Sequence, residues 1–146
     1  MDLHNLLQDV ELFNGLTEIE LVDISQICQE RYVKPGDTVT EQGEPGGEMY
    51  IITEGFVQVS IGRGSKERII VNLGAGQIFG EMALVDKGPR SATVRAMIDP
   101  TVLQVIRTED FDRICNQNTH IGFIVMRNLA SDISFKLRHR NLSEMG

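Results

Sequence analysis

The stretch Phe79-Gly-Glu-Met-Ala-Leu-Val-Asp-Lys-Gly-Pro-Arg-Ser-Ala-Thr93 decides the fold and the function that we predict for this chain. It combines a glycine turn, one short helical segment, an acid and an arginine within a few turns of backbone. Such a combination suits a small ligand that carries one anionic group beside neighbouring hydroxyls. We therefore interpret the rest of the chain largely as a container for this stretch.

Each residue type in the stretch has its own chemical use. Gly80 permits a tight turn, and a short helix predicted over residues 81–85 would offer unpaired amides to an anion. The guanidinium of Arg90 can hold a phosphate with two hydrogen bonds, and Ser91 adds a hydroxyl. The carboxylate of Glu81 suits ligand hydroxyls, as on a ribose. Taken alone, the spacing also fits a simple ion pair between Glu81 and Arg90.

Length and composition are those of an ordinary globular domain. The chain has 146 residues, of which 41% are hydrophobic and 24% charged. Its net charge of −7 argues against nucleic-acid binding by this chain alone, because neutralising phosphates needs a basic face. We expect neither a signal peptide nor a membrane-spanning segment, and therefore a cytoplasmic location.

The residue types that bind metals are scattered along the sequence. Cys28 and Cys115 lie far apart in stretches of helical periodicity, so we expect two small core residues and no disulfide. His4, His120 and His139 all fall in predicted helices, where exposed side chains are expected. A metal-dependent cupin needs histidines within its strands and is disfavoured. We predict no metal ligand, no catalytic residue and no enzyme.

Three regions follow one another within a single predicted domain, residues 1–146. Helices are expected at about residues 3–31. Short β-rich runs separated by glycine turns occupy about residues 32–106, and this spacing is typical of an antiparallel barrel or jelly roll. Helices return at about residues 108–140.

Local signals predict where helices begin and which sides they bury. Thr17 and Glu20 have the spacing of a capping box, and Thr108 is predicted to cap the first helix after the β-rich region. The last helix is expected from about Thr119 towards Arg140. One apolar side comprises Val125, Met126, Leu129, Ile133 and Leu137, and a roughly opposite side comprises Ile121, Ile124 and Phe135. Either one side meets a partner, or the helix is wedged within its own domain.

Several segments together resemble one known family. Phe79-Gly-Glu-Met-Ala-Leu84 with Pro89-Arg-Ser-Ala-Thr-Val-Arg-Ala96 is closely similar to the phosphate-binding cassette of the cyclic nucleotide-binding domain family, which includes the catabolite activator-like cAMP receptors. The likeness continues, in the family's order, through residues 12–16, 34–37, 41–43, 49–55 and 106–111. It implies an α+β fold, mainly β: an eight-stranded antiparallel β-roll between N-terminal helices and a long C-terminal helix.

The resemblance also implies roles for individual residues. Arg90 would neutralise the cyclic phosphate together with Ser91, and Glu81 would accept a hydrogen bond from the ribose 2′-hydroxyl. The neighbouring backbone groups would be those of Gly80, Met82, Ala83 and Ala92. The base pocket would be lined by residues that fit a barrel core equally well: Val59, Ile70, Val71 and Leu73. The terminal helix would form a lid over the base.

These roles predict a cAMP sensor that relays occupancy through its last helix to a partner. Ser91 favours cAMP, because the family often has alanine or serine here in cAMP receptors and threonine in cGMP-selective kinases. A cGMP sensor and a ligand-free scaffold of the same fold remain alternatives. No cofactor is expected beyond the nucleotide. The helix-turn-helix of the catabolite activators does not follow residue 140, so we expect the output in another chain or domain. A homodimer through Leu129 and Ile133 is a further hypothesis.

Overall fold

Two four-stranded antiparallel sheets form the centre of the fold. The structure is a computed structural model that describes residues 2–145, with side chains described for residues 2–140. The strand orders are β1-β8-β3-β6 and β2-β7-β4-β5, and every pairing is antiparallel. The strands are β1 (Cys28–Val33), β2 (Thr38–Thr40), β3 (Glu48–Glu54), β4 (Phe56–Ile61), β5 (Arg68–Gly74), β6 (Ile78–Phe79), β7 (Thr93–Ala96) and β8 (Thr101–Arg107). The predicted antiparallel β-roll is confirmed.

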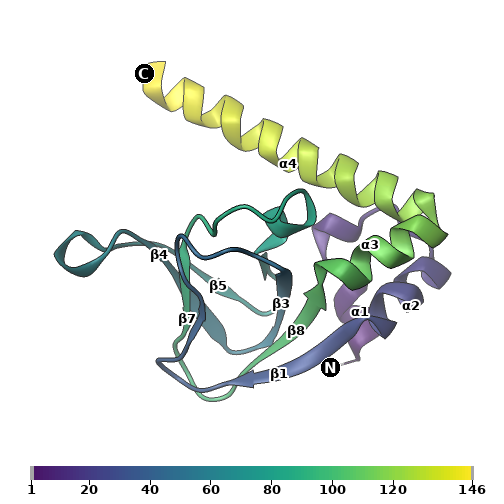
Figure 1. Cartoon of the computed structure of the whole chain (residues 1–146), viewed down its shortest axis with the longest axis horizontal. Coiled ribbons are helices and arrows are strands. Elements are labelled where there is room, and N and C mark those ends of the chain that lie inside the picture. Colours follow the sequence, from purple (N-terminus) through teal and green to yellow (C-terminus); the bar gives the residue numbers. More distant parts are fainter. Residues whose placement is uncertain (1, 146) are drawn as a thin grey trace.

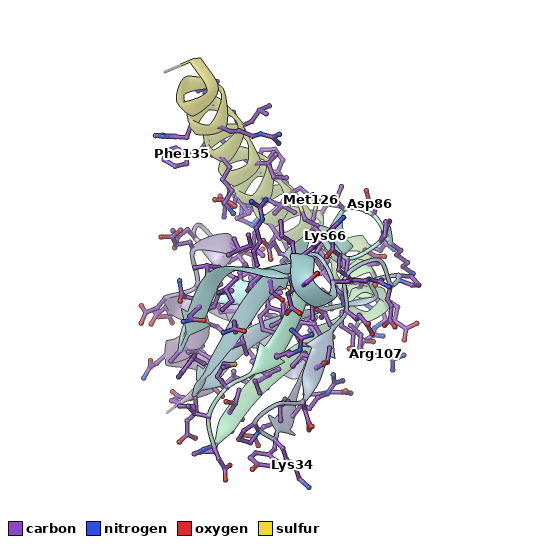
Figure 2. The ribbon with its side chains drawn as sticks, turned by 90° about the vertical axis from the view of Figure 1, so that its left-hand side faces the viewer. Lys34, Lys66, Asp86, Arg107, Met126 and Phe135 are labelled. Atoms are coloured by element: carbon purple, nitrogen blue, oxygen red, sulfur yellow. The ribbon has the colours of Figure 1, made fainter. Side chains whose placement is uncertain are left out.

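Helices gather at one end of the sheets, as Figure 1 shows. The α-helices are α1 (Leu3–Gln8), α2 (Glu18–Gln26), α3 (Thr108–Gln117) and α4 (Thr119–Met145), and short 3-10 turns are η1 (Glu11–Phe13), η2 (Gly64–Lys66) and η3 (Glu81–Leu84). The far half of α4 stands clear of both sheets in the two views (Figures 1 and 2). No helix within residues 2–145 has the length and apolar character needed to cross a bilayer.

Strand β3 separates the two hydrophobic cores. Met49 and Ile51 point into the cluster that the sheet shares with the helices. Tyr50 and Ile52 point into the cluster between the two sheets. Because neighbouring side chains of a strand face opposite ways, a strand buried on both faces has no apolar–polar alternation. The four-residue apolar run Met49-Tyr-Ile-Ile52 therefore marks an interior strand of the fold that is buried on both faces.

The first helices end earlier than predicted. The capping box of Thr17 and Glu20 is present, with both reciprocal hydrogen bonds, and it begins α2. However, Cys28 is the first residue of β1, so the expectation of helix to about residue 31 and of a helical Cys28 is wrong. Strand β1 buries little apart from Val33, and its sequence consequently lacks the apolar alternation that would have revealed it.

The predicted cap of α3 is also wrong. Thr108 is the first helical residue and is buried, while Arg107 occupies the cap position without a side-chain hydrogen bond to the helix. The amide of Thr108 donates to the carbonyl oxygen of Gly47 at 3.0 Å. Thr108 is therefore used in tertiary packing, although local spacing predicted it as the cap.

The buried side of α4 differs from the predicted one. Ile121, Val125 and Leu129 are buried together in the helical core, at positions four residues apart on one face. Placing Ile121 opposite Val125 was therefore incorrect. Leu129 is occupied within its own chain, so the predicted dimer surface loses one of its two named residues. Large apolar side chains that remain exposed on α4 are Phe123, Ile133, Phe135 and Leu137.

Candidate functional site

The turn at Gly80 begins the site. Gly80 has φ +76°, in the left-handed region, and it caps η3. A Cβ atom built there would lie 2.9 Å from Nη1 of Arg90 and 3.0 Å from the carbonyl oxygen of Glu48. Both the backbone conformation and this close approach favour glycine, as predicted from its place in the sequence. The tight turn brings η3 and Arg90 to the same spot.

Arg90 lies against the wall formed by this turn and strand β3. Its Nη2 donates to the carbonyl oxygen of Glu48 at 2.9 Å, and its Nη1 lies 3.5 Å from the carbonyl oxygen of Gly80. The guanidinium carbon sits 5.7 Å from the ring centre of Tyr50. Among the described residues, the structure records no ion pair between Arg90 and Glu81. An arginine has five N–H donors, so these carbonyl contacts leave donors for an anion.

Main-chain hydrogen bonds hold the loop that carries Arg90. The amide of Arg90 donates to the carbonyl oxygen of Glu44 at 2.7 Å, and its own carbonyl oxygen accepts from Gly43 at 2.9 Å. An isolated bridge joins Pro45 to Pro89 next to these bonds. The arginine therefore projects from a paired segment whose position depends on the loop before β3.

Glu81 faces a separate hollow next to this wall. A cleft of about 940 Å³ lies between the N-terminal turn η1, the β5–β6 connection and α4. Glu81 and Leu73 line it from the sheet side, and Phe135 lines it from α4; Figure 2 shows Phe135 projecting from the far half of that helix. Polar residues that sequence reasoning did not single out also line the cleft: Asp9, Asn14, Gln77, Asn128, Asp132 and Lys136.

Residues 30–118 match the family described as the cyclic nucleotide-binding domain, and this range is more than half of the chain. It contains the whole stretch from the Gly80 turn to Arg90. The chain belongs to the cyclic nucleotide-binding domain family.

Relatives of this domain family occur in proteins of different kinds. A cyclic nucleotide-gated potassium channel of Mesorhizobium japonicum is 36% identical over 82% of this chain and 32% of the channel. The cyclic AMP receptor protein of Thermus thermophilus is 33% identical over 90% of this chain and 59% of the receptor. The chain thus spans less than two thirds of each relative.

A solved structure has the same domain architecture. It is the N-terminal domain of a transcriptional regulator from Streptomyces coelicolor, and it superposes with a TM-score of 0.81 at 26% identity. The likeness covers 95% of this chain and 94% of that one. The β-roll with flanking helices is therefore the fold of a cyclic nucleotide-binding domain.

The other predicted ligand residues of this cyclic nucleotide-binding domain lie in η3 or directly after Arg90. Met82 and Ser91 are exposed, Ala92 is half-buried and Ala83 is buried. The amide of Ala83 donates to the carbonyl oxygen of Gly80 at 3.2 Å, inside the turn itself. Their roles towards a ligand stay predictions.

The predicted base-pocket residues divide into two groups. Val59 and Leu73 are half-buried and pack against the core between the sheets. Ile70 and Val71 are exposed on β5, so the alternative interpretation of them as barrel core is wrong. Of the four, Leu73 lines the cleft that also contains Glu81. Their contact with a base stays a prediction.

Sequence reasoning missed two residues of β3 that support Arg90. Burial alone would raise the pKa of Glu48, but hydrogen bonds from Arg31 and Tyr50 and the charges of Arg31 and Arg90 hold it below its usual value. Burial, and then the bond to Glu48, raise the pKa of Tyr50 to about 12. At neutral pH the site therefore has a charged Glu48 beside a neutral Tyr50. The only sequence signal was their place in an apolar strand directly before Gly55.

Proposed function

We propose that this domain is a non-enzymatic sensor that binds a 3′,5′-cyclic nucleotide, with cAMP preferred to cGMP. The observation that carries the proposal is the placement of Arg90 and Glu81 around the Gly80 turn. The guanidinium of Arg90 reaches back to the Gly80 carbonyl, while Glu81, the next residue, lines a cleft. The guanidinium suits the cyclic phosphate of such a nucleotide, and the carboxylate suits its ribose hydroxyl.

Binding would use charge complementarity at the phosphate and hydrogen bonding at the ribose. Arg90 donates to the phosphate oxygens. Each charge-assisted hydrogen bond of this kind contributes about 1.5–3 kcal/mol to binding. Ser91 donates its hydroxyl, and the backbone amides at Met82 and Ala92 complete the anion site, while the amide of Ala83 stays bonded to the Gly80 carbonyl oxygen inside the turn. Glu81 accepts from the 2′-hydroxyl. The base then lies towards Leu73, on the side of the cleft that faces α4.

The preference for cAMP rests on a single side chain and one relative. Ser91 is the residue type often found at this position in cAMP receptors, and the similar protein of Thermus thermophilus is named a cyclic AMP receptor protein. A serine hydroxyl can also reach the amino group of guanine, so cGMP is the second candidate. Competition between the two nucleotides decides the order.

We further propose that occupancy is relayed through α4. The far half of this helix stands clear of the sheets (Figure 1), and its residues Asp132, Phe135 and Lys136 line the cleft. A ligand that contacts one arrangement of α4 better than another shifts the helix population. The receiver is an effector domain or protein, in keeping with the channel and receptor relatives. A cytoplasmic location stays a prediction.

Calorimetric titration with cAMP and with cGMP tests the binding proposal. We expect saturable heat in the wild type and no measurable heat in Arg90→Ala. The matched control is Arg113→Ala, which removes the same charge from an exposed position on α3. Heat that survives Arg90→Ala contradicts the assigned site. No heat and no thermal shift with either nucleotide supports the ligand-free scaffold instead.

Hydrogen exchange tests the relay, and light scattering tests a homodimer. Nucleotide binding should change amide protection within residues 119–140. Identical protection in the free and bound protein would overturn the relay while leaving binding intact. A homodimer through α4 would now use exposed residues such as Ile133 and Leu137. A monomeric mass at high micromolar concentration excludes it.

A further inference from the structure

A continuous set of contacts leads from the protein surface to Arg90. Arg31 of β1 donates through Nη2 to Glu48 Oε2 at 3.1 Å. The hydroxyl of Tyr50 donates to Glu48 Oε1 at 2.8 Å. The ring of Tyr50 then meets the guanidinium of Arg90, with 5.7 Å between its centre and Cζ. Glu48 returns to Arg90 through its carbonyl oxygen, so these contacts form a closed loop.

The ring of Tyr50 is fixed by its contacts with Phe79 and Glu48. It is 2% exposed and stacks on Phe79, with 4.7 Å between ring centres and 17° between planes. Its hydroxyl is tied to Glu48, which is in turn paired with Arg31. A buried aromatic ring with its polar end anchored has few orientations available. The surface that it offers to Arg90 is therefore pre-formed.

We propose that Tyr50 is a positioning residue, which orients the guanidinium of Arg90 for the ligand's phosphate without touching the ligand itself. This inference rests on the proposed function. An unsupported arginine loses side-chain freedom when it binds an anion, and that loss weakens binding. The cation–π contact with a desolvated ring and the bond to the Glu48 carbonyl restrict Arg90 beforehand. The ring matters for this role, and the hydroxyl only keeps the ring in place.

Two substitutions separate the ring from the hydroxyl. Tyr50→Leu should weaken cyclic nucleotide binding by about tenfold, the size of a desolvated cation–π contact. Tyr50→Phe keeps the ring and should stay within about threefold of wild type. Ile52→Ala is the matched control for lost packing, because Ile52 is buried in the same core two residues along β3. It should lower stability without a comparable loss of affinity. Wild-type affinity in Tyr50→Leu, or equal losses in Tyr50→Leu and Ile52→Ala, overturns the proposal.

A spectroscopic measurement decides the contact without any ligand, and it applies even if Tyr50→Leu fails to fold. The chain has two tyrosines, so ring-labelled tyrosine gives two sets of NMR signals, assigned with Tyr32→Phe. Arg90→Ala should shift the Tyr50 ring signals and leave those of Tyr32 in place. Added cAMP should shift the Tyr50 ring signals of the wild type and leave those of Arg90→Ala unchanged.

The two proposals fail in different ways. If the Tyr50 ring signals have the same chemical shifts in Arg90→Ala as in the wild type, the positioning role is overturned. A wild-type protein that gives no heat with either nucleotide overturns the proposed function, and the ligand-free shift still decides whether Tyr50 orients Arg90.

Discussion

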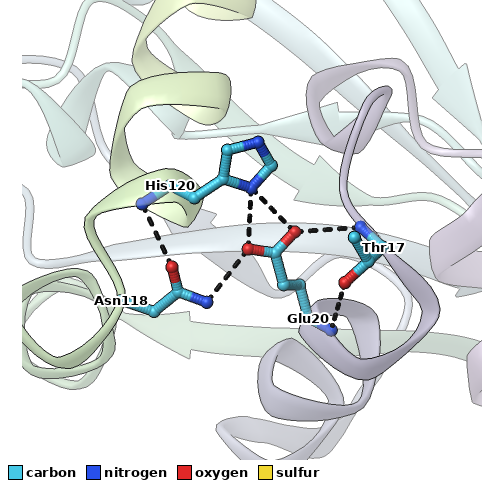
Figure 3. Close-up of polar contacts among 4 residues, drawn as sticks. All are labelled: Thr17, Glu20, Asn118 and His120. Carbon is cyan, nitrogen blue, oxygen red and sulfur yellow. Dashed lines mark hydrogen bonds and ion pairs between the residues drawn. The ribbon is translucent and has the colours of Figure 1, made fainter.

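The carboxylate of Glu20 lies 2.8 Å from Nδ1 of His120, a residue 100 positions later in the chain. Asn118 donates to the same carboxylate at 2.9 Å, and the amide of Thr17 donates to it at 3.0 Å (Figure 3). Glu20 is buried. Through these contacts its carboxylate joins the start of α2 to the first turn of α4. The sequence indicated only an exposed helix residue at position 120, but the side chain of His120 pairs with the buried Glu20.

Glu20→Gln should make the stability of the protein less sensitive to acid. Burial would raise the pKa of Glu20, but hydrogen bonds from Thr17, His120 and Asn118 and the charge of His120 hold it below its usual value. The ionised carboxylate therefore stabilises the fold at pH values above the ordinary pKa of a glutamate, and this contribution is lost as the pH falls through the lowered pKa of the folded state. We expect Glu20→Gln to cost about 1–3 kcal/mol at pH 7.

Urea unfolding at pH 7 and at pH 3 measures this effect. The difference between variant and wild type should be smaller at pH 3 than at pH 7, because the stability contributed by the ionised Glu20 decreases once the pH is below the pKa of the unfolded chain. Glu18→Gln is the control, because Glu18 is exposed in the first turn of the same helix. It should change stability by less than about 0.5 kcal/mol. An equal penalty at both pH values for Glu20→Gln contradicts the assignment.

Gly46→Ala should weaken nucleotide binding, whereas Gly47→Ala should not. A Cβ at Gly46 would lie 2.9 Å from Cζ of Arg90, while nothing lies within 4 Å of one at Gly47. Neither glycine has a positive φ, so both backbones accept alanine. Displacing the guanidinium loses at least one charge-assisted hydrogen bond, which is about a tenfold loss of affinity.

Calorimetry on both glycine variants provides the comparison. Equal affinities in Gly46→Ala and Gly47→Ala would show that the position of Arg90 does not control binding. Their unfolding free energies should be similar, which separates displacement of Arg90 from general destabilisation.

Asn128→Asp should destabilise the protein more than Asn128→Ala. The side-chain nitrogen of Asn128 donates to the carbonyl oxygens of Leu12 at 2.9 Å and Asn14 at 2.8 Å, tying α4 to η1 and to the residue that follows it. Alanine loses both bonds, at a cost of about 1–2 kcal/mol. Aspartate loses them and also places an anion against two carbonyl oxygens. Thermal unfolding of the two variants beside Arg127→Ala, an exposed neighbour, tests this order.

Both cysteines should react slowly with alkylating reagents. Burial raises the pKa of Cys28 to about 12, and burial together with the charge of Asp112 raises the pKa of Cys115 to about 11. Because the thiolate is the reactive form, iodoacetamide at pH 8 should modify the folded protein at least about a hundredfold more slowly than the protein in urea. Equal rates, measured by mass spectrometry, would contradict the burial of both thiols.

Much of the architecture was predictable because its signals are local. The capping box at Thr17 needs only two residues three positions apart, and it is present in the structure. The left-handed turn at Gly80 follows from the absence of a side chain. Strand β4 lies within the predicted β-rich region, because alternating β-branched residues suit a half-buried strand. Strand β1 and the buried side of α4 were misjudged, since their neighbours come from distant parts of the chain.

By itself the sequence determined the family, the succession of a helical, a β-rich and a second helical region, and the residues of the stretch around Gly80 and Arg90. These depend on residue type and on spacings of a few residues. Only the tertiary structure decided that Tyr50 faces Arg90, that Glu81 lines a cleft with α4, and that Glu20 meets His120. Such pairs form where packing brings distant segments together, and the sheet register and burial that set them are not written in any short stretch of sequence.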